Sequence, residues 1–590
     1  MGAIGRAVRQ RLPDGAVPAA RRHWPVAAVL AAGLAVRAVA LAGYPTGLWF
    51  GDSVGYLRVA VTLEPSITRA SAYGVMLLVL RPLHSLFAVV AVQHLLGLLT
   101  AVLLYALVWR HARAAWPGRT LRPGLLGAAA TLPVLFDGYQ IQLEHLLLSE
   151  TLFTFLLVAA VVVLLWNARV GVRAAAAGGL LLGLAGTTRS VGLPLLAIVL
   201  AWLLVLRSGV PWRPAAVLVV SFAVPLLLYA AWFKVVHGRF ALTGTEKVFL
   251  YSRTVDFADC SVIRPRPGLL DLCPRTPPPG VAPAFAVLWT RQSPFFRAPG
   301  GKMGSNERAG EFAWAAIRAQ PADYARVVVR DTLRAFWWKR TVYPQLPTFR
   351  KYEFPARPLH LSRRQAKVAR AYTHRVRPVR VVEPYAGWMR AYQHRVYLPG
   401  IGLGVMLAVA AVAMATGAGP ARPPARSGVA APVGRGRAAL GRRWGCCPGS
   451  GRRRALVFRR ALVRARAAAA GRRGAVRRAL LPWLVVGRGA ARPPARLGVA
   501  APVGRGRAAL GRRWGRCPGS GRRWALSSCR ALARVRRGAV RRALLPWLVA
   551  VGLLVVPAAT ADFDYRYVLP AVPFGALSTV LAIVPPRRSG

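Results

Sequence analysis

Acidic residues are scarce in this chain, which holds 18 Asp and Glu against 83 Lys and Arg in 590 residues, for a formal net charge of +65. Such a charge favours contact with nucleic acid or anionic lipid. Much of it lies in the segment 421–542, which contains no acidic residue and no Lys. A basic tract of this kind binds polyanions nonspecifically, so we expect no specific nucleic-acid partner. The scarcity of acids also makes the position of each one informative.

Cysteine is rare as well, with six residues in the chain. Four of them lie in the basic segment, where no His is near, which argues against a zinc site: Cys446, Cys447, Cys517 and Cys529. Cys260 and Cys273 lie in a polar stretch expected outside the membrane, where a disulfide is permitted. We therefore assign no certain cofactor. A divalent metal stays open, but no ligand motif supports it.

Long apolar runs fill much of the remaining sequence, which is 55% hydrophobic with a mean hydropathy of +0.39. Runs of roughly 17–25 residues are long enough to cross a bilayer. The first contains Arg37 and has no clear cleavage site after it, so we interpret it as a span and not as a signal peptide. We expect an all-α polytopic membrane protein with about ten spans, at 24–43, 86–109, 123–137, 151–166, 174–188, 190–206, 214–235, 398–416, 543–560 and 567–585.

The positions of Arg in the tails and short loops predict the orientation of these spans. If the spans alternate, the Arg-rich tail, the basic loops and the C-terminus fall on one side. We therefore expect a multi-pass plasma-membrane protein with both termini in the cytoplasm. The same parity places three acid-bearing loops together on the outer face, with Asp52, Glu144, Glu150, Asp562 and Asp564.

The spans divide the chain into six regions: a basic tail (1–23), an N-terminal membrane module (24–235), an outer domain of mixed composition (236–397), one membrane helix (398–416), a basic insertion (417–542) and C-terminal membrane helices (543–590). Within the insertion, residues 421–426 return as 491–496. Its Arg, Ala, Gly and Pro bury too little apolar surface to offset chain entropy. We expect a disordered cytoplasmic segment that arose by tandem duplication or by a frame error.

The first outer loop holds the leading candidate for chemistry. Residues 51–56 read Gly-Asp-Ser-Val-Gly-Tyr and closely follow the first apolar run. A carboxylate at Asp52 can accept a hydroxyl proton while a sugar leaves a phosphate. Tyr56 lies one helical turn further on, so the pattern predicts a short helix over 52–60. The structural alternative is that Asp52 only caps this helix.

Two arginines, Arg189 and Arg566, interrupt apolar sequence at the expected outer face. An Arg at that depth is costly unless it is paired or liganded. A guanidinium fork suits a lipid-linked phosphate. Salt bridges to outer acids, or contacts with lipid headgroups, would explain both residues equally well.

Several motifs in order resemble the GT-C superfamily of polytopic glycosyltransferases, in particular its branch of protein O-mannosyltransferases and lipid A aminoarabinose transferases. The resemblance covers 24–235 and 543–585. It rests on residues 52–56 (Asp-Ser-Val-Gly-Tyr), 69–73 (Arg-Ala-Ser-Ala-Tyr), 148–152 (Leu-Ser-Glu-Thr-Leu), the Gly-rich 178–192 with Thr188-Arg189, and 566–573 (Arg-Tyr-Val-Leu-Pro-Ala-Val-Pro).

The resemblance implies an inverting transferase that moves a sugar from a polyprenyl-phosphate donor to a lipid, glycan or protein acceptor outside the membrane, with Asp52 as general base. The first loop has Asp-Ser where relatives often have two adjacent acids, which weakens a metal site there. A transporter or lipid flippase and a non-catalytic scaffold are the alternatives. The residues expected to hold the donor phosphate and the substrate are Arg189, Arg566, Tyr56, Glu144, Glu150 and Tyr567.

Overall fold

The computed structural model describes residues 16–206, 212–416 and 520–585, which belong to one compact unit. This part of the chain is all-α, as expected, and contains no β-strand. Its two isolated bridges join Leu48 to Leu146 and Leu359 to Val379. The region 236–397, expected outside the membrane, is therefore helical too.

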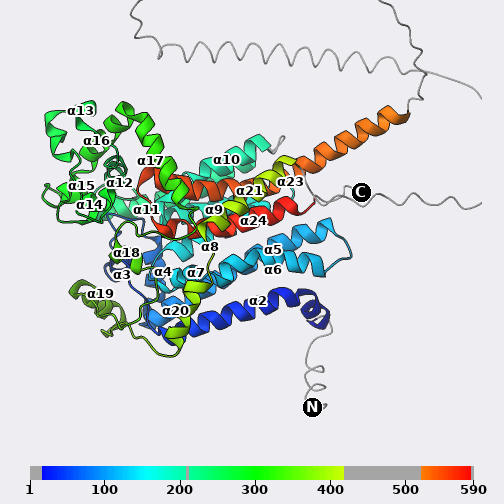
Figure 1. The fold of residues 1–590 in the computed structure, drawn as a ribbon, viewed down its shortest axis with the longest axis horizontal. Helices are drawn as coiled ribbons and strands as arrows, with labels where there is room; N and C mark the ends of the chain where they lie inside the picture. Colours follow the sequence, from blue (N-terminus) through cyan, green and yellow to red (C-terminus); the bar gives the residue numbers. More distant parts are fainter. Residues whose placement is uncertain (1–15, 207–211, 417–519, 586–590) are drawn as a thin grey trace, which may run out of the picture. The chain divides into compact units, whose positions relative to one another are not determined.

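Apolar helices form a bundle in which helices close in sequence pack together, as α5 does with α6, α8 with α9, α9 with α11 and α23 with α24 (Figure 1). In chain order they are α2 (Ala16–Gly43), α5 (Leu86–Ala115), α6 (Leu121–Phe136), α8 (Glu150–Leu165), α9 (Val172–Thr188), α10 (Leu195–Leu206), α11 (Trp212–His237), α21 (Gly400–Thr416), α23 (Ser520–Thr560) and α24 (Val572–Ile583).

Five segments of these helices are long and apolar enough to span a membrane: Arg22–Gly43, Leu86–Ala115, Trp212–His237, Val540–Thr560 and Tyr565–Ile583. A sixth arises if α20 (Tyr385–Arg395) and α21, which meet at 49°, form one bent span. The described residues thus indicate a multi-pass membrane protein with five or six long apolar helices. The other expected spans fall on the shorter helices α6, α8, α9 and α10.

Short helices gather at one end of the bundle (Figure 1). They are α3 (Ser53–Thr62), α4 (Ala72–Leu80), α7 (Gly138–His145), α12 (Glu246–Thr254), α13 (Cys260–Ile263), α14 (Pro283–Trp289), α15 (Gly301–Gly304), α16 (Asn306–Ala319), α17 (Pro321–Arg334), α18 (Leu346–Arg350), α19 (Arg363–Thr373) and α20. Short 3-10 turns lie between them and beside the bundle helices, at η1 (Arg81–Leu83), η2 (Ser190–Gly192), η3 (Pro267–Leu272), η4 (Pro294–Phe296), η6 (Tyr565–Tyr567) and η7 (Leu569–Ala571).

The outer region divides between two apolar cores. Tyr251 of α12 and Phe312 of α16 are buried in one of them. Tyr352 and Tyr372, further along the chain, are buried in the other, together with Tyr56 of the first outer loop. The region predicted as one outer domain therefore contributes α19 and α20 to the core around the first loop.

Cys260 and Cys273 form the disulfide that their spacing permits, with Cα atoms 6.1 Å apart. Cys446, Cys447 and Cys517 lie outside the described residues, as does the expected insertion up to residue 519. Helix α23 begins at Ser520, before the ninth expected span at 543–560. Residues 520–542, which were expected within the disordered insertion, are therefore helical.

Two glycines allow α9 and α11 to approach closely. A Cβ added at Gly179 would stand 2.3 Å from the backbone oxygen of Leu218, and one at Gly183 would stand 2.4 Å from that of Phe222. Backbone atoms cannot rotate away from such a contact, so only glycine fits at these positions without moving a helix.

We expect Gly179→Ala and Gly183→Ala each to lower the thermal unfolding midpoint of the purified protein. Alanine favours a helix by about 0.5–1 kcal/mol over glycine, but overpacking costs about 1–3 kcal/mol. Gly171→Ala is the matched control, because nothing lies within 4 Å of its added Cβ. Unchanged midpoints in both packed variants would contradict this account of the helix contact.

Candidate functional site

A cavity of about 730 Å³ opens where the loop before α3, the turn after α9, the short helices of 236–397 and the segment before α24 meet. This volume is in the usual range of sites for small molecules. Five of the residues predicted from the sequence line it: Asp52, Tyr56, Arg189, Arg566 and Tyr567. The fold thus brings together segments from both ends of the chain.

Asp52 is held between two arginines. It lies at the N-cap position of α3, but its side chain makes no capping hydrogen bond, so the capping alternative does not account for it. Its Oδ1 lies 2.7 Å from Nη2 of Arg69, and its Oδ2 accepts from Nη1 of Arg566 at 2.8 Å. Burial alone would raise the pKa of Asp52, but the guanidiniums of Arg566 and Arg69 outweigh it and hold the pKa well below its usual range.

Arg566 contacts three carboxylates. Besides Asp52, its Nε lies 3.0 Å from Oδ2 of Asp564 and 3.5 Å from Oε1 of Glu150. Asp564 also fixes the backbone here, because its side chain accepts from the N–H of Arg566 at the start of η6. The guanidinium carbon stands 4.9 Å from the ring centre of Phe50. Arg566 is therefore a buried cation that lies among three carboxylates.

Arg189 pairs with Glu150, whose side chain is fully buried at the start of α8. The guanidinium carbon of Arg189 lies 5.0 Å from the ring centre of Tyr567. Oε2 of Glu150 is buried without a hydrogen-bond partner in the described part of the chain. Glu150 does not line the cavity. Arg189 and Arg566 both form salt bridges to carboxylates, as the structural alternative for these arginines requires. The same two guanidiniums nevertheless line the cavity.

Tyr56 is buried on α3, and its hydroxyl shares a hydrogen bond of 2.9 Å with the hydroxyl of Ser149. Burial, followed by the negative charges of Asp52 and Glu150, raises the pKa of Tyr56 to about 12. The phenol therefore keeps its proton at neutral pH and serves as a hydrogen-bond group, not as a base.

Glu144 lies away from the cavity, within the bundle. It is on α7 and fully buried, and it accepts from Nε and Nη2 of Arg37 at 2.8 and 2.9 Å. Nδ1 of His94 lies 3.0 Å from the same carboxylate. These contacts neutralise the charge that Arg37 carries in the first span. Glu144 thus lies in an ion-paired environment away from the cavity, whereas Asp52, Tyr56, Arg189, Arg566 and Tyr567 line it.

Six charged residues of the cavity wall were not among the predicted site residues, although Asp562 and Asp564 were expected on the same face as Asp52: Arg69, Glu246, Lys247, Lys351, Asp562 and Asp564. Arg69 was noted only within a motif, and Asp564 had a usable signal in its spacing of two residues from Arg566. Aromatic side chains of the outer helices also line the cavity, among them Trp289 and Trp314. No local pattern indicates them, because only packing carries α14 and α16 to this place.

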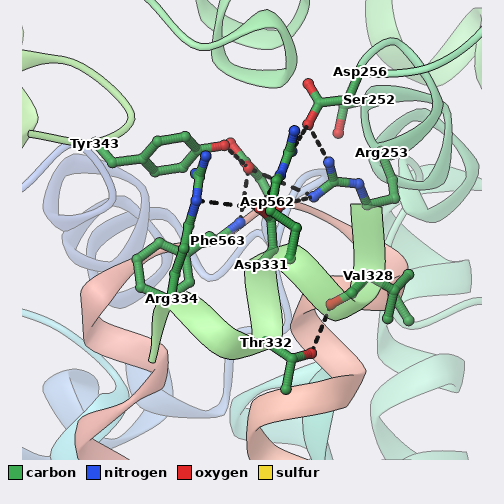
Figure 2. Close-up of polar contacts among 12 residues, drawn as sticks. Ser252, Arg253, Asp256, Val328, Asp331, Thr332, Arg334, Tyr343, Asp562 and Phe563 are labelled. Atoms are coloured by element: carbon green, nitrogen blue, oxygen red, sulfur yellow. Dashed lines mark hydrogen bonds and ion pairs between the residues drawn. The ribbon is translucent and has the colours of Figure 1, made fainter. Parts of the chain in front are cut away.

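Asp562 connects the cavity to the outer helices (Figure 2). The Tyr343 hydroxyl donates to its Oδ1, and Nη1 of Arg253 lies 3.8 Å from the same oxygen. Nη1 of Arg253 also donates to Asp331 at 2.6 Å, and both of these side chains are fully buried. Burial is the main effect that raises the pKa of Asp562 to about 7. Arg253 and Tyr343 lower this pKa, and the negative charges of Asp256 and Asp331 partly offset them.

No family model, no curated protein and no solved structure matches this chain. Among the described residues, no group of three or more His, Cys, Asp or Glu side chains is arranged to hold a metal ion. The function has to be inferred from the cavity and the residues around it.

We expect the raised pKa of Asp562 to make stability depend on pH. The unfolded value is near 3.9, so the native state holds this proton more tightly, and the resulting stability is present below about pH 4 and lost as the pH rises through 7. The unfolding midpoint of the wild type should therefore fall between pH 5 and pH 8. Asp562→Asn should remove part of this fall, worth a few kcal/mol at about 1.4 kcal/mol per pKa unit.

Glu64→Gln is the control for this measurement, because Glu64 is exposed and forms a surface pair with Arg58. Its pH profile should follow that of the wild type. A profile of Asp562→Asn that also follows the wild type would show that Asp562 does not titrate in this range.

Proposed function

We propose that this chain is a membrane glycosyltransferase of the GT-C type, which moves a sugar from a polyprenyl-phosphate donor to an acceptor outside the cytoplasmic membrane. The observation that carries the proposal is the convergence of Asp52, Arg69, Arg189 and Arg566 on one cavity. These residues come from separate segments. Four of the five motifs of the resemblance contain one of them, and the fifth contains Glu150, which pairs with Arg189 and Arg566.

The cavity suits a lipid with an anionic head. Guanidiniums bind phosphate through two parallel hydrogen bonds, and three of them face this space. Pro194, before α10, and Val556 of α23 line the same cavity. A polyprenyl chain can therefore leave along the membrane helices while its phosphate stays at the charged end.

In the proposed reaction, the acceptor hydroxyl oxygen forms a bond to the anomeric carbon of the sugar, and the bond from that carbon to the phosphate oxygen breaks. Asp52 accepts the hydroxyl proton, and polyprenyl phosphate leaves with the bonding electron pair. A single displacement of this kind inverts the anomeric configuration. The acceptor is a lipid, a glycan or a protein.

The proposed topology has ten spans. The five long helices, α21 and the shorter α6, α8, α9 and α10 all cross the bilayer. Support for this comes from the packing of the short helices against long ones, α6 against α5, α9 against α11 and α10 against α23. With ten spans both termini lie in the cytoplasm, and the cavity faces the outside of the plasma membrane.

A lipid flippase is the second candidate. The same combination of cations and an apolar wall would hold a lipid phosphate during transport without any transfer of sugar. Transfer of radiolabelled sugar from a polyprenyl-phosphate donor in proteoliposomes separates the two functions, because a flippase leaves the label on the donor.

We expect Asp52→Asn to lower the rate of sugar transfer at least ~10²-fold, the lower range for loss of a general base. Expression and membrane insertion should stay as in the wild type, because the substitution keeps the shape of the side chain. Glu64→Gln, on the same outer loop, is the matched control and should retain transfer. Near-normal turnover in Asp52→Asn would rule out this assignment.

Arg189→Lys and Arg566→Lys should each weaken donor binding about 10-fold or more, because lysine cannot make the paired hydrogen bonds of a guanidinium. The measurement is the donor concentration at half-maximal transfer, with Arg58→Lys as an exposed control on α3. If both variants keep the affinity of the wild type, the two arginines are structural.

A further inference from the structure

Asp52 is not free to accept a proton in the arrangement described above. Each of its two oxygens is engaged by a different arginine, at 2.7 and 2.8 Å, and the side chain is 8% exposed. A carboxylate held in this way has little tendency to bind a proton. At least one guanidinium must leave Asp52 before it can act as the base of the proposed reaction.

The charges around Asp52 form a closed set. Three carboxylates, those of Asp52, Glu150 and Asp564, are linked through ion pairs to three guanidiniums, those of Arg69, Arg189 and Arg566. An anion that enters the cavity therefore meets arginines that are already paired. It must compete with a carboxylate for them.

Phosphate is well suited to this competition. It offers more oxygens to a guanidinium fork than a carboxylate does. Lys351 lies on the same wall and adds a further cation, which favours the entry of an anion. Arg69 is 21% exposed at its side chain and lies on the loop before α4, so it is the more accessible of the two arginines on Asp52.

We propose that Asp52 occupies the place of the donor phosphate in the empty cavity, and that the phosphate, on binding, takes over the guanidiniums of Arg69 and Arg566. The exchange replaces ion pairs and makes or breaks no covalent bond. It frees the carboxylate of Asp52 at the moment when a sugar is in place. Arg69 is then a positioning residue, since it acts through Asp52 in one state and holds the phosphate in the other. This inference rests on the proposed function.

The exchange has a consequence that a purely structural role of these residues lacks. Removing the charge of Asp52 must strengthen phosphate binding while it abolishes transfer. In the full-length protein, purified in detergent, we expect Asp52→Asn to bind undecaprenyl phosphate about 10-fold more tightly than the wild type, the effect of one charge-assisted hydrogen bond. Adding Arg69→Gln to that variant should remove the gain.

Two further probes identify which part of the lipid is recognised. Inorganic phosphate should displace undecaprenyl phosphate at lower concentration from Asp52→Asn than from the wild type, and uncharged undecaprenol should bind both proteins equally. Glu64→Gln removes one exposed negative charge from the same loop and should leave all three affinities unchanged.

Unchanged or weaker binding of undecaprenyl phosphate by Asp52→Asn would overturn the exchange. An equal gain in Glu64→Gln, or a gain for undecaprenol, would overturn it as well, because the effect would then be one of general charge or of the tail. Sugar transfer by the wild type, measured beside these affinities, tests the proposed function separately. If the wild type transfers sugar but Asp52→Asn binds undecaprenyl phosphate with unchanged affinity, only the exchange is refuted. If Asp52→Asn binds undecaprenyl phosphate more tightly but the wild type transfers no sugar, only the transferase is refuted.

Discussion

The ion pair between Asp52 and Arg566 joins side chains that are 514 positions apart in the sequence, and the cavity depends on it. Asp52 follows the first span and Arg566 begins the last, so the pair ties together the two ends of the described bundle. Glu150 and Arg189 extend it into a chain of charges at the end of α8 and α9. Buried charges in such a place are stable only when they neutralise one another.

A second buried cluster, of Arg37, Glu144 and His94, also neutralises charges inside the bundle but does not line this cavity. The two clusters differ in what satisfies their charges. Arg37 donates to Glu144 and to the backbone oxygens of Val134 and Leu135, so protein groups alone satisfy it. Around Asp52 the carboxylates and guanidiniums border an open volume, where a ligand can exchange with them.

The sequence alone predicted the helical class, the short helix after Asp52 and five of the residues on the cavity wall, because each of these has a local signal. An apolar run indicates a helix, and a charge beside such a run is costly enough to be noticed. The pairing of these charges has no local signal, since it depends on how the start of α3, the start of α8, the end of α9 and η6 come together. Glu144 was placed among the binding residues for this reason: its position in an outer loop was visible, but its contact with Arg37, made when α7 packs against α2, was not.

The position of the cavity between the bundle and the short outer helices determines what it can hold. One wall is apolar and includes Pro194 before α10 and Val556 and Pro557 of α23, one carries the arginines, and a third carries the aromatic rings of α14 and α16. A soluble sugar phosphate has no apolar chain to pack against the apolar wall, and a simple lipid has no sugar to stack on the aromatic wall. The proposed donor, with an apolar chain, an anionic junction and a polar head, would contact all three. The network of Asp562, Tyr343 and Arg253 fixes the third wall to the segment that carries Arg566, so the distance between the aromatic and the charged walls is set by protein contacts and does not depend on the ligand.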